Sequence, residues 1–292
     1  MRLSHCRSLF AVVATSALLL AGCSGGSGTD RDDIGPTDTS SGSLPGGSTV
    51  PPSPAGLHPP FQVAHGLLPY PTDLYFSGST DGTLNIAPAN SLIPAQAALN
   101  SIDGYGVNAP IRARFSGAVS AASLTAASVR VVRVNIDNTT KATVGVAGVL
   151  VPGVDYSVGL ATDAGVGNQI VEIRPLRPLV PSTGATNNGY LVLLTNGITD
   201  AAGTAAVPDT DYATIKNALA GGSTCPGITN PTMNGVCRLT GAHLQIATGV
   251  GLNPANVVLS FSFSTGSTRD SLAAVAAGAS AHPIVVQATG LN

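Results

Sequence analysis

The stretch VVLSFSFST, residues 257–265, alternates Val257, Leu259, Phe261 and Phe263 with serine, which is the pattern of a β-strand. Similar alternating or β-branched runs bounded by turn formers occur elsewhere in the chain: IRARFSG (111–117), VRVVRVNI (129–136), IVEIRP (170–175) and HPIVVQA (282–288). YLVLLT (190–195) is apolar almost throughout, as expected of a strand that is covered on both faces. These runs predict a chain that is mainly β.

Helical patterns are fewer and shorter, and they cover residues 94–102, 209–220, 239–251 and 267–278. The chain has two lysines, one glutamate and no tryptophan, although long surface helices normally use Lys and Glu. Turns are predicted at four dipeptides: Asp81-Gly82, Asn188-Gly189, Asn196-Gly197 and Asn234-Gly235. Strands with a few helices between them predict an Ig-like antiparallel β-sandwich with short inserted helices.

The N-terminus has the features of an export signal. Arg2 and Arg7 precede the uncharged apolar run LFAVVATSALLLAG (9–22), which is too short to span a bilayer comfortably. The run ends in Leu-Ala-Gly-Cys at residues 20–23, which resembles a bacterial lipobox. We therefore expect residues 1–22 to be a lipoprotein signal peptide and Cys23 to be lipidated. An ordinary cleaved secretory signal is the alternative.

Residues 23–60 are expected to be the lipidated cysteine and a disordered tether. The segment is rich in Gly, Ser, Thr, Pro and Asp and has little to bury, so it cannot offset its ordering entropy. Several acyl chains on one cysteine give stable anchoring to a membrane. Ser24, in place of aspartate, favours the bacterial outer membrane, with the protein facing either the periplasm or the cell surface. Residues 61–292 remain for one large domain or two small ones.

Two cysteines remain for the folded part of the chain, because Cys6 leaves with the signal and Cys23 carries lipid. In an oxidising compartment we expect Cys225 and Cys237 to form a disulfide around a loop rich in turn formers. A metal site is the rival interpretation, but two cysteines fall short of a zinc ligand set. His243, six residues further on, is interpreted as a helix-surface or packing residue.

The sequence offers few candidates for chemistry. Thirteen basic and fifteen acidic residues without a basic cluster argue against a nucleic-acid partner. The literal G-x-S-x-G match, residues 22–26, straddles the signal cleavage point and is a false positive for a nucleophile elbow. The segment around Ser280 has His282 where the G-x-S-x-G motif requires its closing glycine. Asp209 and Asp211 are interpreted as helix-capping residues. We predict no metal, no cofactor and no catalytic residue in this chain.

The order of the motifs carries a family resemblance. RFSGAVSAASLTAASVRVVRV (114–134), RPLRPLVPST (174–183) and YLVLLTNGITDAAGT (190–204) together resemble a bacterial Ig-like domain. With PTDLYFSGSTDGTLNI (71–86), ALNSIDGYGVNAPI (98–111) and VVLSFSFSTGSTRDSL (257–272), the chain resembles the N-terminal domain of bacterial virulence-factor lipases. The resemblance covers about residues 61–292.

The resemblance implies a surface lipoprotein in which an α/β-hydrolase domain with a Ser/Asp/His triad follows the sandwich. It therefore implies a non-catalytic N-terminal domain that spaces or positions a downstream lipase domain and its lipid substrate. Whether this chain is itself an enzyme stays open. A free-standing outer-membrane lipoprotein that acts as a binding or adhesion module is the alternative, and a self-contained esterase is a third.

The stretch LPYPTDLYFSGSTDGTLNI (68–86) concentrates unusual residues and raises the question of a binding loop. We expect Pro71 and Asp73 to fix how the chain enters the domain and Asp81-Gly82 to form a turn into residues 83–86. Leu74 and Phe76 are expected to pack inward along a strand, with Tyr75 facing outward. The alternative places Tyr70 and Tyr75 in an aromatic patch that contacts lipid or another ligand.

Overall fold

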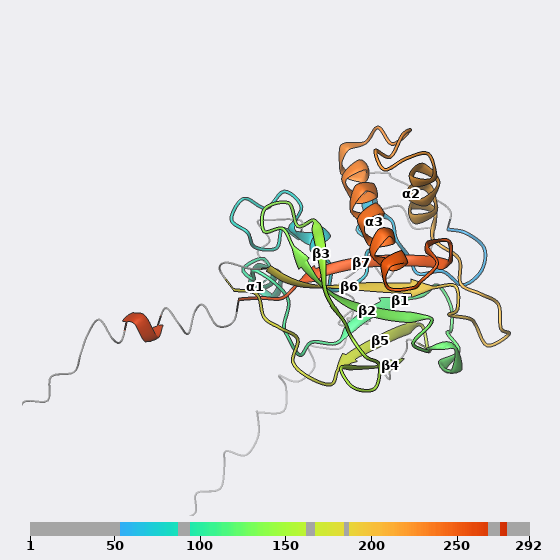
Figure 1. Ribbon diagram of the computed structural model, residues 1–292, viewed down its shortest axis with the longest axis horizontal. Helices are drawn as coiled ribbons and strands as arrows, with labels where there is room; N and C mark the ends of the chain where they lie inside the picture. The colour runs from blue at the N-terminus through green and yellow to red at the C-terminus, as the bar shows by residue number, and fades with distance from the viewer. Residues whose placement is uncertain (1–52, 87–93, 162–166, 184–186, 268–274, 279–292) are drawn as a thin grey trace, which may run out of the picture. The chain divides into compact units, whose positions relative to one another are not determined.

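The computed structural model describes residues 53–86, 94–161, 167–183, 187–267 and 275–278 (Figure 1). Within these residues seven strands form two sheets, and every strand pair is antiparallel. The strands are β1 (Ile111–Arg114), β2 (Val129–Ile136), β3 (Thr143–Val149), β4 (Tyr156–Leu160), β5 (Ile170–Pro175), β6 (Asn187–Thr195) and β7 (Val257–Ser264). The expected mainly β sandwich is confirmed.

One sheet has the strand order β3-β2-β6-β7 and the other has the order β1-β5-β4. β6 lies in the middle of the larger sheet, and its residues from Gly189 to Thr195 are all buried. This confirms the prediction of a strand covered on both faces. Ile111 and Ala113 of β1 are buried, and so is Phe115 directly after the strand, as the alternation in the sequence indicates.

The serines of β7 are buried as well, so this strand is more enclosed than its alternating pattern suggests. Phe261 and Phe263 pair with Val192 and Tyr190 of β6. On the opposite face Ser260, Ser262 and Ser264 are at most 3% exposed. Because helices and the N-terminal part of the domain cover that face, β7 is buried on both sides.

The helices are α1 (Pro94–Leu99), α2 (Thr210–Ala220) and α3 (Pro231–Gly249), together with the 3-10 turns η1 (Val63–His65), η2 (Asp73–Phe76), η3 (Ala121–Ser123) and η4 (Pro254–Asn256). In Figure 1 α2 and α3 lie side by side on the larger sheet. α3 begins eight residues earlier than predicted, because the Asn230 side chain accepts from the Met233 amide and Pro231 suits the first turn. Asn234-Gly235 is consequently helical, and the predicted turn there is wrong.

Two other features differ from the sequence-based prediction. Asn188-Gly189 lies inside β6, where a Cβ on residue 189 would approach the Phe263 carbonyl to 2.9 Å; the glycine serves strand packing rather than a turn. Strands β3 and β4 were not predicted. The Gly, Ala and Val residues of β3 lack a clear alternation. β4, which reads YSVGL, does alternate, but it is only five residues long. The predicted strand 282–288 and most of the predicted helix 267–278 lie outside the described residues.

The N-terminal part of the domain belongs to the same core. Phe61, Phe76, Leu84 and Tyr105 pack in one apolar cluster with the strands. Packing already begins at Leu57, whose carbonyl accepts from the Val207 amide at 2.9 Å. The described residues between 61 and 105, which are 61–86 and 94–105, therefore pack against the sandwich rather than form a separate unit.

Candidate functional site

Residues 70–76 form an irregular segment that ends in a 3-10 turn, not in the expected strand. Tyr70 bridges to Arg112 of β1 through two backbone hydrogen bonds of 3.3 and 2.9 Å, and the Tyr70–Pro71 peptide bond is cis. The chain then turns through η2, whose N-cap Thr72 accepts from the Leu74 amide. Because the backbone is not extended here, side chains do not alternate in and out: Phe76 is buried, but Leu74 is only half-buried.

An aromatic cluster surrounds Tyr105. Its ring meets Tyr70, Phe76 and Phe263 edge-on, at centroid distances of 5.5, 6.2 and 6.1 Å. The Tyr105 hydroxyl donates to the Thr72 carbonyl at 2.6 Å. This cluster joins the 68–86 segment to β7.

Tyr70 and Tyr75, the two residues predicted to contact a ligand, are both half-buried. Burial raises the pKa of both hydroxyl groups. The pKa of Tyr75 rises to about 12, because the nearby Tyr70 adds to the effect of burial. Both side chains also pack against the apolar core. The ligand-contacting role of these two residues stays a prediction.

Asp73 is the buried acidic residue of this segment. Its Oδ1 accepts from the Ser264 amide at 2.8 Å and from the Ser264 hydroxyl at 3.0 Å, whereas its Oδ2 has no partner. Burial raises the pKa of Asp73 to about 7, although the hydrogen bonds from Ser264 and the positive charge of Lys141 each lower it. Lys141 lies 4.5 Å from the centroid of the Phe76 ring, which is a cation–π contact.

The turn at Asp81-Gly82 forms as predicted. Asp81 Oδ1 accepts from the Ser79 hydroxyl and from the amide and hydroxyl of Thr83, at 2.8 to 3.1 Å. Gly82 has a φ of +81°, a conformation that favours glycine. The turn places Leu84 in the core, where it is 2% exposed.

A Ser–His pair that the sequence did not predict joins α3 to β7. His243 Nδ1 is 3.2 Å from Ser260 Oγ, and His243 Nε2 is 3.3 Å from Thr143 Oγ1. Ser260 also bonds to the Tyr212 hydroxyl at 2.7 Å. With His243 only 1% exposed, burial lowers its pKa to about 3. The pair is sealed from solvent and fastens α2, α3 and β3 to β7.

The sequence model of one protein family, described as bacterial virulence factor lipase N-terminal, matches residues 68–291. The chain belongs to this family. The resemblance in the motif order is thereby confirmed. No curated protein matches the chain.

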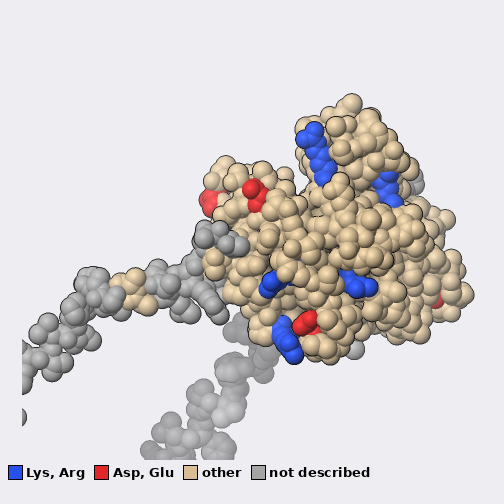
Figure 2. Space-filling view, viewed as in Figure 1, with Lys and Arg blue, Asp and Glu red and all other residues tan. Residues whose placement is uncertain are grey.

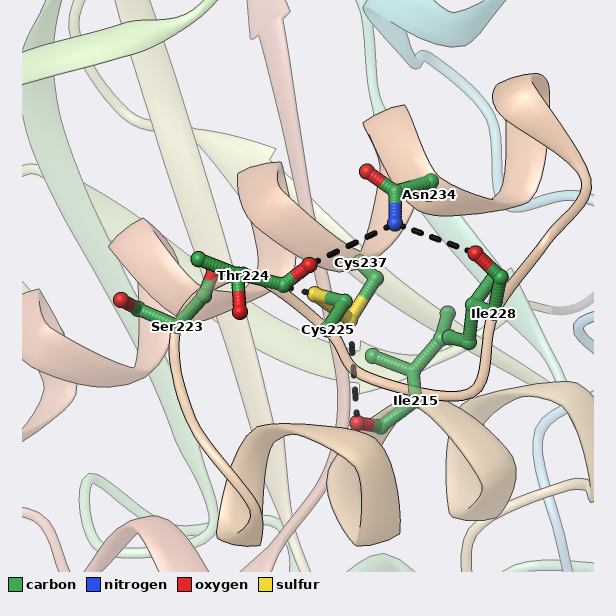
Figure 3. The surroundings of a disulfide bond; sticks show 7 residues. All are labelled: Ile215, Ser223, Thr224, Cys225, Ile228, Asn234 and Cys237. Atoms are coloured by element: carbon green, nitrogen blue, oxygen red, sulfur yellow. Dashed lines mark hydrogen bonds between the residues drawn. A yellow bond between two sulfur atoms is a disulfide. The ribbon is translucent and has the colours of Figure 1, made fainter.

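In this lipase N-terminal domain the predicted disulfide is present. Cys225 and Cys237 are bonded, with their Cα atoms 6.3 Å apart (Figure 3). Cys225 follows α2 and Cys237 lies in α3, so the bond joins the loop between the helices to the second helix. Asn234 reinforces the loop by donating to the Ile228 carbonyl at 3.2 Å, as Figure 3 shows. The disulfide therefore holds the helical layer together.

The carboxylates of α2 also serve structure. Asp209 is the N-cap of α2 and accepts from the Thr210 amide at 2.7 Å through Oδ1. Its Oδ2 accepts from the Phe61 amide at 2.7 Å, and Asp211 Oδ2 accepts from the Val63 amide at 3.0 Å. The capping interpretation is confirmed for Asp209, and both carboxylates hold the incoming chain.

Charged groups are sparse and scattered on the face drawn in Figure 2. Glu172 on β5 lies between Arg112 and Arg174, with the Arg112 Nη2 to Glu172 Oε2 distance at 2.8 Å. Although burial raises the pKa of Glu172, the two guanidinium groups hold it below its ordinary value. This cluster links neighbouring strands of the smaller sheet.

Within the part of the chain that the structure describes, no three His, Cys, Asp or Glu side chains are grouped to hold a metal ion. Among the same residues, no helix combines the length and apolarity needed to cross a bilayer. Cys23, the G-x-S-x-G match at 22–26, Ser280 and His282 lie outside the described residues. Lipidation of Cys23 stays a prediction.

Proposed function

We propose that this chain is the non-catalytic N-terminal domain of a lipid-anchored bacterial surface lipase, where it spaces or positions the catalytic domain and its lipid substrate. The observation that carries the proposal is the family match over residues 68–291. The lipobox-like Leu20-Ala21-Gly22-Cys23 supports anchoring to the outer membrane.

A positioning domain has to hold the segments that enter and leave it, and the contacts at both ends fit this requirement. The incoming chain is held by Asp209 and Asp211 through the amides of Phe61 and Val63. At the outgoing end, the Gly266 amide donates to the Tyr105 carbonyl at 2.9 Å. Both ends are thus bonded to the packed body of the domain, which supports a spacer that transmits position.

The polar pairs inside the domain support a structural role. His243 and Ser260, which resemble part of a hydrolase site in residue type, are buried and hydrogen-bonded to each other, to Thr143 and to Tyr212. Asp73 and Ser264 are likewise buried and bonded to each other. In the proposal, catalysis belongs to the downstream domain that the family resemblance implies.

The first test is the reading frame beyond Asn292. An in-frame hydrolase region with a G-x-S-x-G elbow supports the proposal, and alanine at that serine should abolish ester hydrolysis by the full gene product. A genuine stop codon there overturns it in favour of a free-standing lipoprotein that acts as a binding module. The 292-residue chain should also be offered a short-chain chromogenic ester. Turnover lost on one Ser→Ala change within it would instead identify a self-contained esterase.

Anchoring is tested separately with Cys23→Ser and the matched control Ser27→Ala. We expect radiolabelled palmitate in the control but not in Cys23→Ser, and we expect only the control to fractionate with the outer membrane. Protease added to intact cells then distinguishes the cell surface from the periplasmic face. Equal palmitate labelling of the two variants would contradict lipidation at Cys23.

A further inference from the structure

The chain leaves β7 through residues 265–267, and contacts hold it beyond the end of the strand. The Thr265 amide donates to the Asn188 carbonyl at 3.0 Å, so the pairing with β6 continues one residue past β7. The Thr265 hydroxyl donates to the Val180 carbonyl at 2.7 Å. These contacts fix one side of the outgoing chain to the sandwich.

Residues 103–105 hold the other side of the outgoing chain, and we call them the exit clamp. The Tyr105 amide donates to the Ser264 carbonyl, and the Gly266 amide donates to the Tyr105 carbonyl, both at 2.9 Å. This bridge is parallel, whereas the strand pairs of the two described sheets are antiparallel. The exit clamp is therefore an addition to the outer edge of β7 and not a continuation of either sheet.

Gly104 brings the exit clamp and the outgoing chain into close backbone contact. A Cβ on residue 104 would lie 2.6 Å from the Thr265 carbonyl oxygen and 2.6 Å from the Gly266 amide nitrogen. Because nonbonded atoms do not approach so closely, any side chain here would push the two backbones apart. Next to it, Asp103 Oδ2 accepts from the Ser267 amide at 3.3 Å and from the Ser267 hydroxyl.

The exit clamp is itself anchored in the core. Tyr105 is 2% exposed, its ring packs edge-on against Phe263, and its hydroxyl donates to the Thr72 carbonyl at 2.6 Å. Just before the clamp, the Leu84 amide donates to the Ile102 carbonyl at 3.0 Å. Because the clamp is fixed to the core, it determines the path of the outgoing chain rather than moving with it.

Protection of a sheet edge is a simpler role for such contacts, since an uncovered edge strand promotes aggregation. Edge protection accounts for the bridge between Tyr105 and Ser264. It does not account for Asp103, which bonds Ser267 three residues after β7 ends. The contacts thus extend past the sheet, along the direction in which the chain departs.

We propose that the exit clamp fixes the direction in which the chain leaves the domain, and thereby sets how the downstream lipase domain meets lipid at a membrane surface. The inference rests on the proposed function and names the residues through which positioning acts. Orientation matters for lipid in a membrane, because the substrate is fixed in a surface, whereas a soluble ester approaches from any direction. Asp103 and Gly104 are accordingly positioning residues.

Hydrogen exchange in the 292-residue chain tests the clamp by itself. Gly104→Ala should speed exchange of the Gly266 amide by roughly tenfold, because the added Cβ pushes the backbones apart. Gly106→Ala is the matched control: a Cβ there lies 3.6 Å from its nearest neighbour, so the Gly266 rate should not change. Asp103→Ala alters an exposed side chain and should speed exchange at Ser267 without disturbing the core. Unchanged exchange in both clamp variants overturns the proposal.

Ester hydrolysis by the full gene product tests the consequence. In Gly104→Ala and Asp103→Ala, turnover of a soluble short-chain ester should match the wild type. Turnover of a long-chain ester carried in phosphatidylcholine vesicles should fall by roughly fivefold or more, because the site is misaligned with the surface. Gly106→Ala should leave both rates unchanged. An equal fall on both substrates, or no fall on vesicles despite faster amide exchange, overturns the role in orientation.

Failure of the proposed function gives a different result. A wild-type gene product that hydrolyses neither ester would overturn the proposed function, and with it the role of the clamp in presenting lipid. The exchange rates at Gly266 and Ser267 would still decide whether the clamp holds the outgoing chain.

Discussion

Asp73 accepts two hydrogen bonds from Ser264, one from its amide and one from its hydroxyl, across 191 positions of sequence. This contact fastens η2 to the C-terminal end of β7, while Tyr105 packs against Phe263 beside it. The unusual composition of residues 68–86 is thus used largely in building the domain. The contact is also costly, because the second carboxylate oxygen of Asp73 is buried without a partner.

The first prediction concerns the pH dependence caused by Asp73. Its pKa is about 7 in the folded protein and near the ordinary 3.8 when unfolded, so its contribution is most favourable at low pH. Between about pH 4 and pH 7 the carboxyl group is deprotonated in the unfolded state but still protonated in the folded state. The free energy of unfolding therefore falls as pH rises through this range. Between pH 5 and pH 8 the penalty grows by about 3 kcal/mol. Urea titrations at both pH values should show the wild type losing this much stability relative to Asp73→Asn, because the opposite contribution of His243 is common to both proteins.

Asp73→Asn is a suitable comparison because its amide oxygen can still accept from Ser264, while its charge is absent at every pH. All other titrating groups are common to both proteins, so the difference between the two pH profiles isolates Asp73. The charged neighbour Lys141 is retained in both. Parallel profiles from pH 5 to pH 8 would contradict a buried carboxylate with a raised pKa.

The second prediction has the opposite sign and concerns His243. Burial holds its pKa at about 3, below the ordinary 6.5, so the neutral ring contributes stability above pH 6.5 that is lost as pH falls towards 3. At pH 5 the loss amounts to about 2 kcal/mol. Relative to the wild type, His243→Gln should lack this acid sensitivity in urea titrations between pH 7 and pH 5, because the opposite contribution of Asp73 is common to both proteins. Thr143→Val, which keeps the histidine, should retain it, and a variant as acid-sensitive as the wild type would refute the assignment.

The accuracy of the sequence-based prediction depended on how local each signal was. β2 and β5 have the predicted limits, because β-branched residues bounded by turn formers specify a strand locally. β3 was missed because an edge strand of small residues has no buried face to produce alternation. Likewise, the pairing of Asp73 with Ser264 depends on tertiary contacts, and no spacing in the sequence encodes it. The same is true of His243, which only packing converts into a buried neutral group.

The third prediction concerns the disulfide. Closing the loop between Cys225 and Cys237, a separation of 12 residues, restricts the unfolded chain and contributes about 3 kcal/mol in the chain-entropy model. For a domain of this size, the loss should lower Tm by roughly 6–12 °C. Calorimetry of the wild type with and without reductant measures the change. The double variant Cys225→Ala/Cys237→Ala should melt near the reduced protein and should not respond to reductant; a response would show that reductant acts elsewhere.

The fourth prediction concerns the attachment of the incoming chain. Asp209→Ala removes the cap of α2 and also leaves the buried Phe61 amide without its acceptor, so we expect a loss of about 2–4 kcal/mol in the free energy of unfolding. The Phe61 amide should also exchange its hydrogen markedly faster.

Asp211→Ala is the matched control, since its carboxylate holds only the half-buried Val63 and should cost less. Asp209→Asn keeps one acceptor oxygen for two amides and should fall between the two alanine variants. If Asp209→Ala destabilised the protein while exchange at Phe61 stayed slow, Asp209 would act as a helix cap alone. The incoming chain would then be held by its apolar contacts, such as the edge-on packing of Phe61 against Tyr212 at 5.7 Å.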